Sequence, residues 1–359
     1  MNDDAKVILE VKNLDITFKM DDRNVHAIRG VDLKLRQNEI LAIVGESGSG
    51  KSISAKTIMG ILPDNAVINS GSVILKGDGE DTELLTKDMD WRQANINGTK
   101  IAMVFQDPMT SLNPVMKIGN HFYTVIRSHE KISRKEAWSR GADLLKEVGI
   151  TEPERTLNQY PHQLSGGMKQ RIVIALALSC NPDILICDEP TTALDVTIQD
   201  RILKLIQTIQ RARGLSIIFI SHNLGVVSRI SDYIAVMYAG RVIETGTVFD
   251  VLYDPRHPYT WGLLCSVPDS DEKSDGLYTI PGAPPDLSSE LKGDPFAPRN
   301  KYALEVDFKA EPPMFRISDS HYAATWLADE RAPKVEMPDD LKARIEKMRK
   351  EGADYVRRR

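Results

Sequence analysis

A glycine-rich segment, GESGSGKS at residues 45–52, has the residue types that bind phosphate groups. It follows the apolar run LAIV and matches G-x-x-x-x-G-K-[ST], which binds nucleotide phosphates where a strand leads into a helix. Its glycines let backbone N–H groups point at phosphate oxygens, and the helix adds its positive dipole end. Lys51 is expected to reach the β- and γ-phosphates and Ser52 to ligate Mg²⁺. The alternative is a turn without a ligand. The predicted nucleotide-binding residues are Gly45, Glu46, Ser47, Gly48, Ser49, Gly50, Lys51 and Ser52.

Two carboxylates end another apolar run, ILICDEP at residues 184–190. Asp188 is expected to hold Mg²⁺ through water, and Glu189 to polarise the attacking water as the general base. The alternative is an exposed acidic strand end. The acidic residue beside the magnesium carboxylate favours hydrolysis over nucleotide binding alone.

Residues 164–171, LSGGMKQR, place two adjacent glycines at the start of a helical segment. Each glycine in a helix costs roughly 1 kcal/mol relative to alanine, so bare backbone must serve a purpose there. A nucleotide-binding protein with one phosphate loop has no use for such a segment. Lys169 and Arg171 are expected to make solvent and local packing contacts.

These residues need elements that position them. Apolar runs rich in Ile, Val and Phe lie at residues 41–46, 101–107, 184–189 and 216–222. Such runs indicate parallel strands that are buried on both faces. Residues 196–213 place apolar side chains on one helical stripe, which Gly214 should end. Strands that alternate with helices predict an α/β fold with a parallel core sheet.

Other segments add to this core. Alternating apolar and polar residues at 7–18 and 31–39 predict an N-terminal antiparallel β-subdomain, and residues 234–246 predict a hairpin. Residues 108–160 have mostly helical patterns and predict a helical subdomain at about 108–175 that carries the LSGG segment. Beyond residue 260, a Pro-rich and Gly-rich stretch predicts irregular chain, and residues 338–359 predict a charged amphipathic helix or a frayed tail.

Composition limits the class of protein. The chain has 359 residues and a net charge of −5, so no basic field suggests nucleic acid as a partner. No apolar run reaches the roughly 20 residues of a membrane-spanning helix, and the acidic N-terminus has no signal-peptide core. We therefore expect a cytoplasmic protein. Its three cysteines have no paired spacing and are expected to be reduced.

The order of the motifs resembles the ATP-binding cassette of ABC transporters over about residues 7–260. The motifs are GESGSGKS, Gln106 after IAMVF, LSGGM, ILICDEP, Ala193-Leu194-Asp195 and His222 after SIIFIS. The resemblance implies that ATP is the nucleotide and that two cassettes pack head to tail around two ATP molecules. Ser165, Gly166 and Gly167 would then face the γ-phosphate bound to the opposite cassette, which accounts for the bare backbone.

The resemblance also implies roles for residues at matching positions. Gln106 would contact Mg²⁺ and the attacking water, and His222 would contact the γ-phosphate and hold the water and Glu189 in place. Asp195 would bridge the two cassettes near the hydrolytic site. Phe18 would stack on adenine, and the alternative for this residue is a core position in the first strand.

Three stretches narrow the resemblance to the ATPase subunits of oligopeptide and dipeptide importers. They lie at residues 105–119, 222–246 and 254–268. The last stretch contains HPYT and precedes the Pro-rich segment IPGAPPDL. The sequence MYAG, within the second stretch, resembles that of the D-type subunit. This implies a peptide-import ATPase bound peripherally to the cytoplasmic side of the cell membrane. Its implied partners are a homologous second ATPase in a heterodimer, two transmembrane permeases and an extracellular peptide-binding protein, with no nucleic acid. The expected division is a cassette at 1–260, an importer-type extension at 261–335 and a charged tail at 336–359.

The extension departs from the family pattern at one group of positions. Family members often hold an iron–sulfur cluster there on cysteines, and this chain has Asp294, Asn300, roughly Asp307 and Thr325 instead. Hard oxygen donors do not suit such a cluster, so none is expected. Ordinary hydrogen bonding and another bound cation both remain open. The framing residues persist, which predicts that the fold of the extension persists too: Phe296, Arg299, Tyr302 and His321.

Other functions stay open at this point. The same cassette could power a nickel, metal-chelate or sugar importer. A soluble ABC ATPase of translation or DNA repair usually has tandem cassettes, coiled-coil insertions or zinc modules, and none is visible in the sequence. A P-loop kinase would not need LSGGM, and a regulatory chain without activity would lack Glu189 or His222.

Overall fold

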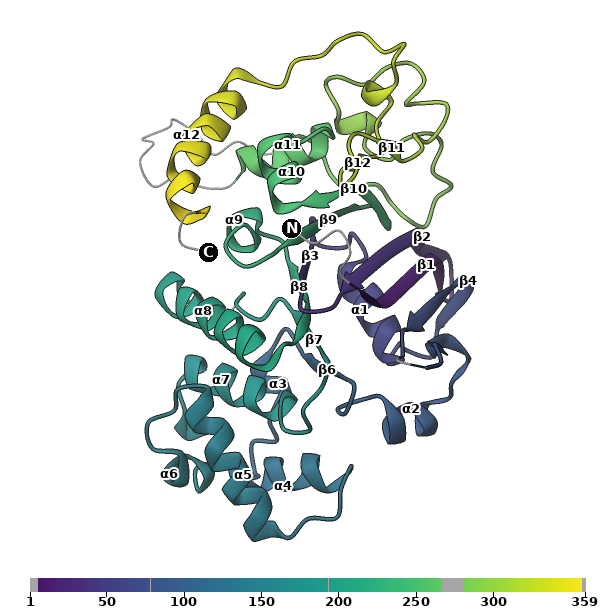
Figure 1. The fold of residues 1–359 in the computed structure, drawn as a ribbon. Helices are drawn as coiled ribbons and strands as arrows, with labels where there is room; N and C mark the ends of the chain where they lie inside the picture. Colours follow the sequence, from purple (N-terminus) through teal and green to yellow (C-terminus); the bar gives the residue numbers. More distant parts are fainter. Residues whose placement is uncertain (1–5, 78, 193, 267–279, 357–359) are drawn as a thin grey trace.

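In the part of the chain that the structure describes, a central sheet has eight strands in the order β11-β12-β10-β9-β3-β8-β7-β6. The computed structural model describes residues 6–77, 79–192, 194–266 and 280–356 (Figure 1). The parallel strands are β9 (Tyr233–Tyr238), β3 (Ile40–Val44), β8 (Ser216–Ser221), β7 (Ile184–Asp188) and β6 (Ile101–Val104). Antiparallel strands extend the sheet at one side, namely β10 (Arg241–Thr247), β12 (Tyr322–Ala323) and β11 (Phe315–Arg316). The predicted parallel α/β core and the predicted hairpin at 234–246 are therefore confirmed.

A second, antiparallel sheet covers one face of the central sheet. Its strands are β2 (Asn24–Arg36), β1 (Val7–Lys19), β4 (Ala66–Leu75) and β5 (Thr82–Glu83), in that order. Helix α1 (Lys51–Met59) shares the core on this face, with α2 (Met89–Asn95) and the short turn η1 (Leu84–Thr86) nearby in the chain. Leu41 and Ile43 of β3 point into this core, whereas Ala42 and Val44 point to the other face. This alternation explains why the strand is apolar at every position.

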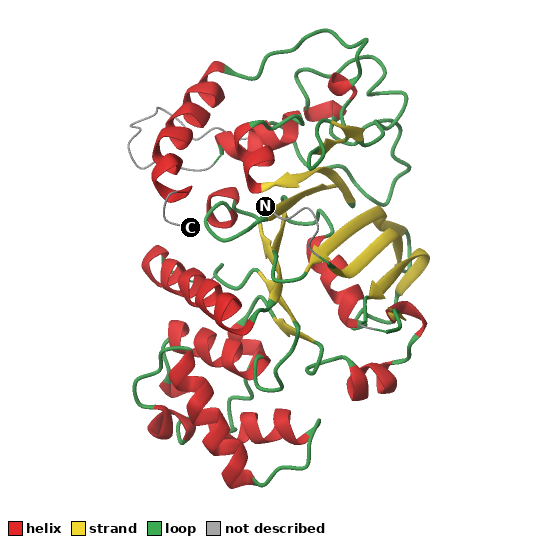
Figure 2. Cartoon of the chain, viewed as in Figure 1, coloured by secondary structure: helices red, strands yellow, loops and turns green. Residues whose placement is uncertain are grey.

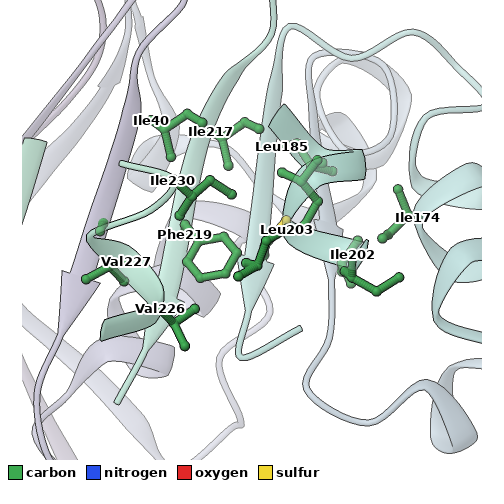
Figure 3. Close-up of a cluster of buried hydrophobic side chains, with 14 of the residues drawn as sticks. Ile40, Ile174, Leu185, Ile202, Leu203, Ile217, Phe219, Val226, Val227 and Ile230 are labelled. Atoms are coloured by element: carbon green, nitrogen blue, oxygen red, sulfur yellow. The ribbon is translucent and has the colours of Figure 1, made fainter. Parts of the chain in front are cut away.

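Helices cover the opposite face. They comprise α3 (Pro108–Ser111), α4 (Ile118–Arg127), α5 (Arg134–Glu147), α6 (Pro153–Leu157), η2 (Pro161–Gln163), α7 (Gly166–Ala177), α8 (Val196–Arg213) and α9 (Leu224–Val227). Figure 1 shows α4 to α7 gathered at one end, as the predicted helical subdomain requires. Figure 3 shows Phe219 of β8 packed among Leu203 of α8 and Val227 of α9. Helix α8 ends as predicted, because Gly214 adopts the left-handed conformation at φ 64°.

The chain after β10 forms α10 (Val248–Tyr253), α11 (Pro258–Cys265), the turns η3 (Ala297–Arg299) and η4 (Trp326–Ala328), and α12 (Asp339–Val356). Most of the described part between α11 and α12 is loop, as predicted (Figure 2). This part packs into the same hydrophobic core as the cassette through Phe296, and α12 does so through Leu341 and Ile345. The last segment is therefore a docked helix, and packing is continuous across residue 261. Within the described residues, no helix is long and apolar enough to cross a bilayer.

Candidate functional site

The phosphate loop joins β3 to α1, as its motif predicts. Gly48 lies at φ +81°, a conformation that side chains rarely adopt, and no atom lies within 4 Å of where its Cβ would stand. At Gly45 a Cβ would lie 2.1 Å from the Met237 carbonyl oxygen, so only glycine fits. The loop is thus curled and open at Gly48, which suits close approach of a phosphate to its backbone.

Lys51 and Glu46 face different parts of the molecule. Lys51 is buried, and its Nζ donates to the carbonyls of Gly45 and Glu46, each at 2.8 Å. Burial lowers the pKa of Lys51, while the carboxylates of Glu189 and Asp188 oppose that shift. Glu46 differs from the expectation of a phosphate contact, because its N–H donates to the Tyr259 hydroxyl and its carboxylate pairs with Arg299. These contacts tie Glu46 to α11 and to the C-terminal extension.

Ser52 and Asp188 form the candidate magnesium site. Ser52 Oγ donates to Asp188 Oδ1 at 2.8 Å, which joins the start of α1 to the end of β7. Asp188 is 4% exposed, and burial raises the pKa of its carboxyl group. A divalent cation would stabilise that buried charge, and a hydroxyl with a carboxylate oxygen is a donor set that Mg²⁺ accepts. The residues therefore fit the predicted ion.

The predicted catalytic residues converge on one oxygen of Glu189. Its Oε2 accepts hydrogen bonds from Gln106 Nε2 at 3.2 Å and from Thr192 Oγ1 at 2.9 Å. The same oxygen lies 3.2 Å from His222 Nδ1. These groups come from the ends of β6, β7 and β8, which are neighbours in the sheet. The backbone of Glu189 is left-handed at φ 46°, and this sparsely populated conformation turns the side chain toward them.

The LSGG segment lies apart from the phosphate loop of its own chain. Ser165 caps α7 by accepting the N–H of Met168, and Asp195 caps α8 by accepting the N–H of Ile198. Helix α7 packs on the face of the central sheet opposite α1. Among the residues that the structure describes, no hydrogen bond or ion pair joins residues 165–167 to residues 45–52. Ala193 of the predicted motif lies outside the described residues.

The two glycines of this segment have different environments. A Cβ at Gly167 would lie 3.0 Å from Ile198 Cγ2, so a side chain there would force Ile198 of α8 to shift by a few tenths of an ångström. A Cβ at Gly166 would meet only Leu194 Cδ2 at 3.7 Å, an ordinary contact. The fold of this chain therefore does not require glycine at 166, and the exposed position suits an outside group that approaches the backbone.

Two further sequence expectations concern neighbouring residues. Phe18 lies in β1 with a partly buried ring packed against the core of that face, which leaves both stacking and packing open. Arg171 donates to the Val148 carbonyl and Lys169 is buried, so both serve local packing as predicted.

Comparisons with known proteins agree with this geometry. The ABC transporter family model matches residues 28–192, and the model of the oligopeptide/dipeptide transporter C-terminal region matches residues 243–306. The oligopeptide transport ATP-binding protein OppD of Bacillus subtilis is 52% identical over 343 residues, covering 95% of this chain and 94% of that protein. The chain belongs to the ATP-binding proteins of oligopeptide and dipeptide ABC transporters. This confirms the predicted family and its D-type subgroup.

Further matches support the same family. The dipeptide transport ATP-binding protein DppD of Lactococcus lactis subsp. cremoris is 50% identical over 339 residues, covering 94% of this chain and 95% of that protein. A solved dimeric ATP-binding cassette, MJ0796 bound to ADP and Pi, aligns with a TM-score of 0.57 and 29% identity over 67% of this chain and 99% of that chain. The chain is thus an ABC-type ATPase with the predicted fold.

Sequence reasoning missed three residues of the site. Thr192 follows the carboxylate pair and lacks a motif of its own. Tyr259 belongs to HPYT, a segment typical of the family whose structural role its sequence does not reveal. Arg299 was noted as a framing residue of the extension. Tyr259 and Arg299 both contact Glu46 across more than 200 residues of chain, a distance at which sequence patterns carry no signal.

The positions that replace the family's cysteines make local hydrogen bonds. Asp294 and Asn300 each accept the N–H two residues ahead, at 2.9 and 3.0 Å. Thr325 accepts the N–H of Leu327, and Asp307 that of Leu304. Within the described residues, no group of three or more His, Cys, Asp or Glu side chains is placed to hold a metal ion. These contacts favour ordinary hydrogen bonding as the role of the four residues.

Proposed function

We propose that this chain hydrolyses ATP to power the uptake of oligopeptides or dipeptides through an ABC transporter. The observation that carries the proposal is the convergence of Gln106, Thr192 and His222 on Glu189 Oε2, beside the phosphate loop. The two relatives described above are named for oligopeptide and dipeptide transport, and the match to the C-terminal region supports that cargo over nickel, metal chelates or sugars.

The chain's own groups account for hydrolysis as follows. The loop amides and Lys51 hold the phosphates of ATP, and Ser52 and Asp188 would hold Mg²⁺, whose charge would offset that of the phosphates. Glu189 accepts the proton of the attacking water, while Gln106 and His222 hold the carboxylate in place. Phe18 stacks on the adenine ring with the exposed part of its own ring.

A second cassette completes each site. The exposed Ser165 and Gly166 at the N-terminus of α7 contact the γ-phosphate bound to the partner cassette, and Asp195 lies at the junction. The partner is a homologous ATPase, and the pair docks peripherally on two permeases at the cytoplasmic side of the membrane. An extracellular binding protein delivers the peptide.

The proposal is tested by isolating the tagged chain from its native membranes in mild detergent and identifying the proteins recovered with it. We expect a related ATPase, two permeases and a peptide-binding protein, and ATP-dependent peptide uptake after reconstitution. Recovery of nickel-, chelate- or sugar-binding proteins would change the cargo. Recovery of ribosomes or DNA-repair factors would contradict the transport function.

A further inference from the structure

Every polar group of Glu46 in the phosphate loop has a hydrogen-bond partner in the chain. Its N–H donates to the Tyr259 hydroxyl at 2.8 Å, and its carbonyl accepts from Lys51 Nζ at 2.8 Å. Its carboxylate accepts hydrogen bonds from both terminal nitrogens of Arg299, at 2.7 and 3.0 Å. The Glu46 carbonyl also accepts the N–H of Ser49 at 3.2 Å. Tyr259 is on α11 and Arg299 on η3, so two of the four partners come from the C-terminal part of the chain.

Arg299 can hold Glu46 in one position because it is itself fixed. Its Nε donates to the Pro281 carbonyl at 2.8 Å, and Nη1 donates to the Tyr238 hydroxyl at 3.2 Å. The guanidinium carbon lies 5.7 Å from the centre of the Tyr238 ring, and the side chain is 5% exposed. A planar guanidinium with this many partners binds a carboxylate through two parallel hydrogen bonds and keeps its orientation.

Tyr259 is equally constrained. It is fully buried, and its ring lies 4.7 Å from that of Tyr238 and 5.4 Å from that of Phe296, measured between centroids. The Tyr259 N–H donates to His257 Nδ1, which caps the start of α11. The first residue of HPYT thus caps the helix, and the third residue reaches the phosphate loop with its hydroxyl.

These contacts bear on the ATP site through two peptide groups. Gly45 and Glu46 supply the two carbonyls that hold the Lys51 ammonium, and the N–H fixed by Tyr259 belongs to the peptide between them. We propose that Arg299 and Tyr259 are positioning residues for the ATP site, through which the C-terminal extension sets the affinity of the phosphate loop for ATP. The inference rests on the proposed function, because it assumes that this loop binds ATP.

A second ion pair of the extension provides a matched control. Glu311 pairs with Arg29 and Arg241 of the cassette, and it also ties the extension to the cassette. Among the contacts of the described residues, none joins Glu311 to residues 45–52. Glu311→Gln therefore removes the same chemical group as Glu46→Gln at a place where Glu311 makes no direct contact with the loop.

The experiment measures the Kd of Mg-ATP for the full chain by calorimetry, and the KM and kcat for ATP in the assembled transporter. The variants are Glu46→Gln, Arg299→Gln, the double variant Glu46→Gln/Arg299→Gln, Tyr259→Phe and Glu311→Gln. We expect Glu46→Gln, Arg299→Gln and Tyr259→Phe each to raise Kd and KM about tenfold. Their kcat should stay within threefold of the value for the unmodified chain. The Kd of the double variant should lie within twofold of the Kd of either single variant, because both substitutions break the same ion pair. Glu311→Gln should stay within twofold of the unmodified chain.

Tyr259→Phe removes one oxygen atom, so it keeps the test valid if the buried-charge variants do not fold. Unchanged Kd for Glu46→Gln and Tyr259→Phe would overturn the inference, as would an equal loss for Glu311→Gln. If the unmodified chain itself binds no ATP, the proposed function fails and the inference fails with it. If the unmodified chain binds ATP and the variants bind it with the same Kd, the inference alone fails.

Discussion

Glu189 combines two features that a general base needs, an oriented carboxylate and a backbone that presents it. Its left-handed conformation costs on the order of 1–3 kcal/mol, and Gln106, Thr192 and His222 all contact its Oε2. An amide at this position would keep the shape but would accept no proton.

We therefore predict that Glu189→Gln lowers turnover at the affected site by 100-fold or more, a usual magnitude for loss of a general base, while ATP still binds. The expected product is an ATP-bound cassette pair that stays closed. Turnover by phosphate release and dimer formation by light scattering check the two halves of the prediction. Unchanged turnover would show that Glu189 is not the base.

Asp294 illustrates a different residue-scale effect, the cost of burying a carboxylate. The side chain is 5% exposed, and burial raises the pKa of its carboxyl group to about 6. The raised pKa means that the folded chain binds more protons than the unfolded chain between about pH 4 and pH 6. Stability from this group is therefore present at low pH and is lost as the pH rises through 6.

Asp294→Asn keeps an oxygen acceptor for the Phe296 N–H and removes the charge. We expect the variant to be more stable than the unmodified chain at pH 7.5, by up to about 3 kcal/mol, with a smaller difference at pH 4.5. Thermal unfolding of both proteins across this pH range measures the effect. Parallel pH profiles would contradict it.

At the scale of elements, α12 shows how the last segment is fastened to the cassette. Leu341 and Ile345 enter the core, and the helix contacts α10 and α11. The Arg344 and Arg349 side chains donate to the carbonyls of Cys265 and Tyr253. Apolar burial on one face and hydrogen bonds at its border dock a helix that is otherwise rich in charged residues.

Leu341→Ala should therefore lower the free energy of unfolding by about 2–4 kcal/mol, because it leaves a cavity in a fully buried position. Glu346→Ala, on the exposed side of the same helix, is the control and should change stability by less than about 0.5 kcal/mol. Denaturant unfolding compares the two variants. Equal stabilities would show that α12 is not docked in solution.

At the scale of the whole molecule, one chain holds the parts of an ATP site without bringing them all together. Ser52 of the phosphate loop bonds Asp188, the residue before Glu189, whereas the exposed Gly166 begins α7 on the opposite face of the central sheet from α1. The proposed pairing of two cassettes would resolve this separation, because each chain would then present its α7 terminus to the loop of the other.

Gly166→Asp tests this arrangement. Its side chain would meet only an ordinary contact in its own chain, and an acidic residue is favourable in the first turn of a helix. We expect unchanged stability and unchanged ATP affinity of the isolated chain. Turnover of the assembled transporter should fall at least tenfold, because the carboxylate would face the γ-phosphate. Weakened ATP binding by the isolated chain would mean that the segment acts within its own chain.

The sequence alone determined the features that depend on neighbouring residues. The phosphate loop, the carboxylate pair, the buried strands and the end of α8 at Gly214 were all predicted, because backbone conformation and periodicity are local properties. The order of the motifs added the family. The amphipathic pattern at 338–359 showed that a helix could form there but did not show what it packs against.

Tertiary structure alone decided which side chains meet. Gln106 and Glu189 are 83 residues apart, Glu46 and Arg299 are 253 apart, and their contacts depend on how the whole chain packs. The motif at 45–52 predicts a phosphate contact for Glu46. In the folded chain its carboxylate pairs with Arg299 and its N–H donates to the Tyr259 hydroxyl. A motif specifies residue types and spacing, but a side chain binds whichever partner the packed chain places within reach.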